Sequence, residues 1–275
     1  MKNYLRLLVA FVFCLCTTSI SAQKKTLLIS ESGLPYTEQT WYAYGEGQSL
    51  VETDITSNWN LGKRIVSASY TSEGWLVIMA RNTGYDRQSF SLTDEWPEEW
   101  ISNKSKEGYA VTSLSRSEKE WLVVMSHGSG ISGQAVWRNS WANLAPWITE
   151  QKGRGYFITD LAYDGEAWTV VMSQTAKYLS QGYFWEPSTS ELLSRVQSSV
   201  WGRGFNLHQV VYGEGNYVVV FGNYSNGDDR FQNLQVNPDD PKEYIRQQWD
   251  RGICISYVGG GLPKSPKKHK SWFSK

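Results

Sequence analysis

Two short segments carry residue types that could do chemistry. Residues 127–130 read His-Gly-Ser-Gly, which is similar to the oxyanion-hole loop of some hydrolases. Residues 81–84 occupy the same place in another copy of a repeated pattern, so we interpret both as β-hairpin turns. Besides His127 the chain has His208 and His269, a thin supply for a histidine-based triad or metal cluster. No catalytic residue is predicted here.

The second segment, residues 226–229, reads Asn-Gly-Asp-Asp and offers oxygen atoms that could bind calcium. The spacing of a calcium-binding loop is absent, however, and Asn-Gly is a strong hairpin signal. Phe221 and Gln232 are eleven residues apart, whereas other copies of the repeat have nine at this point. We therefore predict a lengthened turn, no metal site and no cofactor.

Two pairs of adjacent carboxylates, Glu98/Glu99 and Asp239/Asp240, suggest the two carboxyls of a glycoside hydrolase. Both pairs accompany a Pro-containing segment that is predicted to be a short helix. Negative charge is favourable at a helix N-terminus, so a solvated helix start is the favoured interpretation.

The aromatic content is high, with 14 Trp, 16 Tyr and 9 Phe. Aromatic side chains at repeated positions are expected to pack in the core and between modules. Aromatic residues outside the repeat are better candidates for binding a ligand, because a flat ring can stack on a sugar or anchor a protein partner. We predict a ligand-binding role for Trp41, Trp137, Trp141 and Trp185.

The elements that must position these side chains form a repeat. Residues 108–113 and 121–126 read as two short strands, and residues 155–160 and 168–173 repeat them. A glutamine on a third strand and a short helix complete each module. A side-chain amide can donate and accept, so these glutamines are predicted to bridge one module to the next. The structural repeat positions are Gly62, Gly108, Gly155, Gly204 and Gly252, with Gln39, Gln88, Gln134, Gln181 and Gln232.

The repeat is split between the two ends of the chain. Residues 253–257 begin a fifth module that then stops, and residues 25–30 match the missing second strand. A linear solenoid has no reason to divide a unit in this way, but a ring does, because joining its ends protects sheet edges. We predict a mainly β fold over residues 23–261: five β-β-β-α modules closed as a β-propeller-like ring, with the last module completed by the N-terminal strands.

The modules also resemble a known family. Residues 99–126, repeated at 147–173, are similar to a domain of unknown function at the C-terminus of plant and algal casein-kinase-I-like kinases, which also occurs alone. The resemblance implies a shared architecture, no catalytic residues, and a protein- or ligand-binding role. The chain has no glycine-rich phosphate loop, catalytic Asp loop or magnesium motif, so kinase activity does not carry over.

Residues 1–22 read as a secretory signal peptide, with two basic residues before a ten-residue apolar run and cleavage predicted after Ala22. The run is too short to span a bilayer, and no other segment is long enough. The mature chain would keep Cys254 alone, so no intramolecular disulfide is expected. Residues 262–275 form a basic tail that is predicted to be disordered.

With 27 Lys+Arg against 27 Asp+Glu, the chain is not a globally basic nucleic-acid binder. The regular repeat, the aromatic excess and the lack of a catalytic set favour binding over catalysis. We expect a secreted or periplasmic, monomeric, non-enzymatic module that binds a protein or glycan. The alternative is a secreted, glycan-directed hydrolase with its site in the ring centre.

Overall fold

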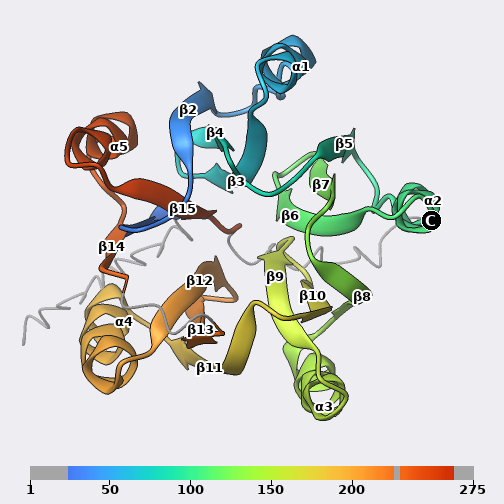
Figure 1. Cartoon of the computed structure of the whole chain (residues 1–275). Helices are drawn as coiled ribbons and strands as arrows, with labels where there is room; N and C mark the ends of the chain where they lie inside the picture. Colours follow the sequence, from blue (N-terminus) through green and yellow to red (C-terminus); the bar gives the residue numbers. More distant parts are fainter. Residues whose placement is uncertain (1–23, 226–229, 263–275) are drawn as a thin grey trace, which may run out of the picture.

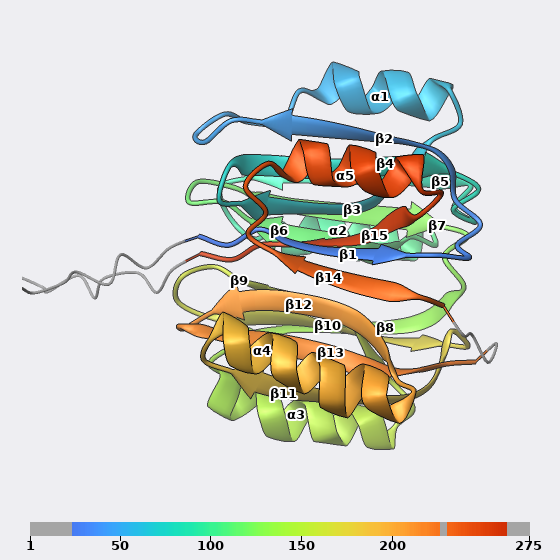
Figure 2. The same cartoon turned by 90° about the vertical axis from the view of Figure 1, so that its left-hand side faces the viewer.

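The computed structural model describes residues 24–225 and 230–262. Within these ranges the chain is mainly β and forms five three-stranded antiparallel sheets. The sheets lie around a common centre with helices at the periphery (Figure 1), and the helices pack along the outer side of the sheets (Figure 2). The predicted signal peptide and residues 263–275 of the predicted tail lie outside the described residues.

Each sheet has an outer, a middle and an inner strand, in that order in space. The outer strands are β2 (Thr37–Tyr44), β5 (Arg87–Thr93), β8 (Ile131–Asn139), β11 (Tyr178–Glu186) and β14 (Gln232–Val236). The middle strands are β4 (Gly74–Arg81), β7 (Trp121–His127), β10 (Trp168–Thr175), β13 (Asn216–Tyr224) and β1 (Leu27–Glu31). The inner strands are β3 (Arg64–Thr71), β6 (Ala110–Arg116), β9 (Phe157–Tyr163), β12 (Asn206–Gly213) and β15 (Cys254–Gly259). The helices are α1 (Glu52–Asn60), α2 (Glu98–Lys106), α3 (Trp141–Gly153), α4 (Thr189–Arg195) and α5 (Pro241–Asp250).

The sheets divide the sequence repeat at a different point from the one predicted. The order of elements along the chain is as expected, but the glutamine-bearing strand belongs to the following sheet. Strand β8 pairs with β10, whereas β7 pairs with β5 and β6. The unit in space is therefore β-α-β-β. A periodic sequence has the same spacing wherever it is divided, so spacing alone could not locate this boundary.

The last sheet joins the two ends of the chain. Strand β1 lies between β14 and β15, with Leu28 opposite Gln235 on one side and Val258 on the other. The pairing confirms that the N-terminus completes the last module. It does so with one strand, not with several as predicted, because β2 pairs with β4 in the first sheet.

The five repeated glycines end the helical segments. Gly62 and Gly108 have φ angles of 78° and 87°, in the left-handed region that favours glycine. The amide of Gly62 bonds to the Trp59 carbonyl, and the next amide, Lys63, bonds to the Asn58 carbonyl. This pair of bonds turns the chain sharply from the helix into the inner strand. The same geometry recurs at Gly155, Gly204 and Gly252.

Two helical segments depart from the predicted pattern. The α3 helix begins at Trp141, so Pro146 lies inside it, whereas α2 begins directly after Pro97. The segment after α4 continues as a π-helical turn, Val196–Val200, and a 3₁₀ turn, Trp201–Arg203. The wider π turn accommodates extra residues, which explains the longest glycine spacing, from Gly155 to Gly204.

The core lies between neighbouring sheets. The repeated aromatic residue at the first or second position of four middle strands is at most 4% exposed. One apolar cluster joins Tyr44 and Trp75 of the first sheet to Leu122 and Val124 of the second. Packing between sheets therefore supplies much of the buried apolar area that stabilises the fold. The buried aromatic residues are Trp75, Trp121, Trp168 and Tyr217.

Each repeated glutamine bonds to the inner strand of the preceding sheet. The Ile65 amide donates to Oε1 of Gln88 over 2.7 Å, and Nε2 of Gln88 donates to the Ile65 carbonyl over 2.9 Å. One side-chain amide thus satisfies both backbone groups of a single residue. We call this arrangement the glutamine clamp. It also joins Gln39 to Ile255, Gln134 to Val111, Gln181 to Ile158 and Gln232 to Leu207.

Three of the clamps include a tryptophan from the preceding module. The indole N–H of Trp59 donates to Oε1 of Gln88 over 3.2 Å. Each of these tryptophans lies three residues before a module glycine, so the glycine turn and the clamp hold the helix end in place together. The other two pairs are Trp249 with Gln39 and Trp201 with Gln232.

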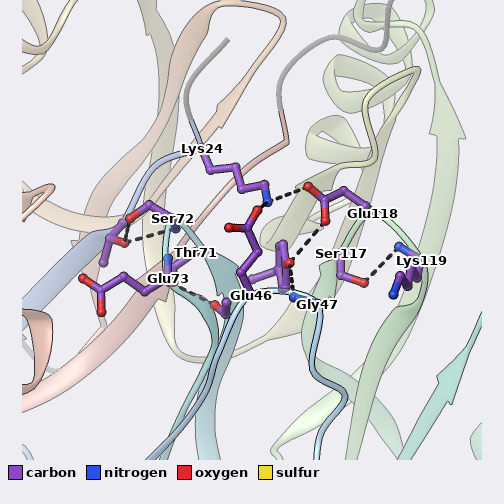
Figure 3. A network of polar contacts seen from close by, with 12 residues as sticks. Lys24, Glu46, Gly47, Thr71, Ser72, Glu73, Ser117, Glu118 and Lys119 are labelled. Atoms are coloured by element: carbon purple, nitrogen blue, oxygen red, sulfur yellow. Dashed lines mark hydrogen bonds and ion pairs between the residues drawn. The ribbon is translucent and has the colours of Figure 1, made fainter. Parts of the chain in front are cut away.

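A lysine near the start of the described chain ties two sheets together. The Lys24 ammonium lies 2.5 Å from a carboxylate oxygen of Glu46, after β2, and 2.5 Å from one of Glu118, between β6 and β7 (Figure 3). It also lies over the Tyr70 ring. Burial alone would lower the pKa of Lys24, but the bonds to Glu118 and Glu46 outweigh burial and the pKa is raised. Lys24, the second residue after the predicted cleavage site, is thereby held between the two sheets.

Deleting residues 23–31 is expected to destabilise the protein strongly, because it removes the fully buried middle strand β1 and exposes the edges of β14 and β15. We expect aggregation, or a Tm lowered by at least about 10 °C, as for a loss of several kcal/mol. Calorimetry measures this, with deletion of residues 263–275 as the control. A truncated protein that melts like the parent would contradict the role of β1.

Gln88→Ala is expected to lower the free energy of unfolding by about 1–3 kcal/mol, because it leaves the buried Ile65 backbone groups without partners. Denaturant unfolding gives the value. Gln247→Ala on the exposed face of α5 is the matched control and should change stability little. Equal effects of the two substitutions would argue against the glutamine clamp.

Candidate functional site

A cavity of about 130 Å³ lies at the centre of the five sheets. All five inner strands line it through their first halves, together with the loops that follow the middle strands. The five modules converge here. Each contributes residues of different types to the lining, although the modules repeat.

A β-bulge in every inner strand supplies part of the lining. The register of each inner strand against its middle strand shifts at the fourth residue after the module glycine. A bulge re-aims the extra side chain and increases the local twist. The five bulged residues all line the cavity: Val66, Thr112, Thr159, His208 and Ser256.

The end of the channel opposite the cavity is filled by the C-terminal segment. A Cβ on Gly260 would lie 1.9 Å from the Tyr70 carbonyl, and one on Gly261 would lie 1.7 Å from the Tyr212 carbonyl. Only glycine fits such close approach. Leu262, which the sequence placed at the start of a disordered tail, is 4% exposed and packs in the core. Tyr257 lies between the cavity and the end that the C-terminal segment fills, and it forms the cavity floor. The cavity therefore opens toward the other end.

Four tyrosines and a lysine surround the open end. Tyr36, Tyr85 and Tyr178 recur at one place in three modules, and Tyr224 ends β13. The ammonium of Lys177 lies 5.4 Å from the ring centre of Tyr178 and 5.6 Å from that of Tyr224. The recurrence of these tyrosines is a sequence signal that could have identified the site, but repetition suggested packing. The lysine carries no such signal.

Lys177 is exposed to solvent yet surrounded by protein, because it lies inside the cavity. Within the described part of the chain, no carboxylate forms an ion pair with its ammonium. Interaction with the phenols, Tyr178 first, raises the pKa of Lys177 well above its usual value, although burial opposes this. The cavity therefore contains a charged, unpaired ammonium at neutral pH.

His208 is the most polar of the bulged residues and is 7% exposed. Its ring stacks on Tyr178, with centroids 4.5 Å apart, and lies 4.8 Å from the Tyr224 ring. Burial first, and the charge of Lys177 second, lower the pKa of His208 to about 3. The imidazole is thus neutral across the physiological range. Its Nε2 is buried with no partner among the described residues.

The two carboxylates of the lining are both engaged. Glu31 lies 3.3 Å from a guanidinium nitrogen of Arg230. Asp160 accepts the backbone amides of Leu114, over 2.6 Å, and Leu161, over 2.8 Å. Burial raises the pKa of Asp160 to about 8 although these bonds lower it. Asp160 therefore bridges two inner strands in the way that Ser113 does, by accepting an amide from the preceding sheet.

The structure does not bring the four predicted ligand-binding tryptophans together. Trp141 and Trp185 contact each other edge to face at 4.5 Å and pack on buried Trp168. Trp137 is 37% exposed and contacts Trp147. Trp41 is half-buried beneath Lys242. These contacts are packing contacts in the described chain, and a ligand role for the four stays a prediction.

The other sequence candidates lie on the surface or outside the description. His127 ends β7 and contacts Asp86 over 2.8 Å at an exposed turn. Residues 226–229, whose oxygen atoms could bind calcium, are not among the described residues. Across residues 24–225 and 230–262, no three His, Cys, Asp or Glu side chains gather as they would around a metal ion. No described helix is both long and apolar enough to cross a membrane.

Comparison with known proteins identifies one family model. A model described as "Domain of unknown function (DUF7477)" matches residues 12–139. The matched range ends at the last residue of β8 and covers the whole of the first and second sheets, together with strands β1 and β8. Neither the curated proteins nor the solved structures contain a match to the chain.

The raised pKa of Asp160 predicts a pH effect on stability. The folded protein holds a proton that the unfolded chain releases near pH 4, so the stability contribution of this group falls as pH rises to about 8. The slope is at most about 1.4 kcal/mol per pH unit. Asp160→Asn cannot ionise and keeps one of the two acceptor oxygens, so the variant should lose some stability at every pH, but its Tm should rise relative to that of the parent between pH 5 and 8. Parallel pH profiles would contradict a raised pKa.

Proposed function

We propose that the protein is an exported, non-enzymatic binding domain in which the five sheets form one closed β-propeller-like ring, and that the central cavity holds a small ligand. Closure is supported by the inner strands, which contact one another in the cyclic order β3, β6, β9, β12, β15 and back to β3. It is supported also by β1, which joins the two chain ends in one sheet. Export to the periplasm or medium rests on the predicted signal peptide.

The observation that carries the binding role is the character of the cavity lining. Four polar bulged residues line its wall, and Lys177, which has no carboxylate partner among the described residues, lies among four phenols at its open end. Ligand sites are concave and combine aromatic walls with a few placed polar groups. The Lys177 ammonium makes cation–π contacts with Tyr178 and Tyr224 but no ion pair within the described residues, so its charge is available to a ligand.

The hydrolase alternative needs two carboxyls placed on either side of one bond. Glu31 and Asp160, the carboxylates of the lining, are held by Arg230 and by backbone amides. Their engagement favours binding over acid–base chemistry. The resemblance of the modules to a kinase-associated domain without catalytic residues argues in the same direction.

A ligand screen on the mature protein tests this proposal. Small molecules and glycans are tested by ligand-observed NMR, beside a broad panel of hydrolase substrates. Ser129→Trp, on the loop that lines the cavity, should abolish the interactions, whereas Ser57→Trp on the exposed face of α1 should keep them. Hits that bind Ser129→Trp equally well, or a substrate turned over in a carboxylate-dependent way, would overturn the proposal.

A further inference from the structure

The glutamine clamp fixes the tautomer of His208. The Ile158 amide donates to Oε1 of Gln181, and Nε2 of Gln181 donates to the Ile158 carbonyl, so the orientation of this side-chain amide is determined. The atom 3.3 Å from Nδ1 of His208 is therefore the amide nitrogen, which is a donor. Nδ1 must accept, and the single hydrogen of the neutral ring must be on Nε2.

This Nε2–H is a buried donor without a partner in the described chain. An unsatisfied buried donor is costly, and native proteins rarely keep one without a reason. His208 also departs from its repeat, because two other modules carry a threonine at this position whose hydroxyl bonds to a serine, as in Thr112 with Ser126. The donor lines the cavity, where a ligand acceptor atom would satisfy it.

A second donor of the cavity is charged. The Lys177 ammonium has no carboxylate partner in the described residues and lies beside the two rings that stack with His208. Arg230 is balanced by Glu31, and Asp160 carries little charge at neutral pH because burial raises its pKa to about 8. The lining residues that the structure describes therefore carry a net positive charge, which favours a negatively charged ligand.

The size of the cavity limits the ligand. Its volume is about 130 Å³, and an engineered apolar protein cavity of about 150 Å³ holds a benzene molecule.

We propose that the cavity binds a small organic oxyanion no larger than benzoate, with the Lys177 ammonium and the His208 Nε2–H donating to its oxygen atoms and with any part that exceeds the enclosed volume lying at the open end. The inference rests on the proposed binding function and adds the charge and the size of the ligand. The shared chemistry is an oxyanion, and carboxylates and phosphates are both members of this class.

The test compares probes of one shape and different charge: benzoate, neutral benzamide and cationic benzamidine, with phenyl phosphate and inorganic phosphate as further arms. Affinities are measured by calorimetry on the mature protein at constant ionic strength. We expect benzoate or phenyl phosphate to bind and the neutral and cationic probes to bind at least about tenfold more weakly, as for loss of a charged hydrogen bond. The stronger of the two anions identifies carboxylate or phosphate.

Variants connect the affinity to the two donors. Lys177→Gln should weaken anion binding by about tenfold or more, and Lys177→Arg should restore most of it. His208→Phe keeps a stacked ring without the N–H and should weaken binding by roughly three- to tenfold. Lys106→Gln, on the exposed surface of α2, is the control and should change nothing.

The outcomes separate this inference from the proposed function. Benzamide or benzamidine binding as tightly as benzoate, with sensitivity to Ser129→Trp, would overturn the anion class and leave the binding function standing. Anion binding that is unchanged in Lys177→Gln would overturn the assigned donors. If no probe binds and the ligand screen also finds nothing sensitive to Ser129→Trp, both proposals fail.

Discussion

The fold depends on one interaction that recurs at every junction between sheets, the glutamine clamp. Each three-stranded sheet buries apolar side chains against its neighbours, so the sheets must be held in one arrangement relative to each other. Apolar packing supplies attraction but little directional information. The clamp supplies the direction, because a side-chain amide meets the N–H and C=O of one residue, such as Ile65, in one orientation. A sheet that slid by one residue would lose both bonds.

The clamp also links architecture to the candidate site. It holds each inner strand close to its bulge, and the bulged side chain lines the cavity. In one module the same glutamine, Gln181, orients His208 as well as Ile158. A structural interaction thereby decides which nitrogen of a cavity histidine carries the hydrogen. The chemistry of the site is set by the element that joins the sheets.

A repeated sequence has produced an asymmetric centre. Inner-strand positions that are equivalent in the repeat hold Ser67, Ser113, Asp160, Gln209 and Tyr257. Both serines and the aspartate accept an amide from the neighbouring inner strand, whereas Tyr257 closes the cavity floor. The modules therefore share their outer packing and differ where they meet.

The sequence by itself determined the number of modules, their order of elements and the joining of the chain ends, because each is expressed in local spacing. It also identified the glutamines as bridges, since an amide is both donor and acceptor. Only the tertiary structure decided which strands share a sheet. A periodic sequence has the same spacing wherever it is divided, so spacing did not show that β8 pairs with β10. It alone placed Lys177 beside His208, since a contact between side chains from different elements leaves no periodic trace in a single sequence.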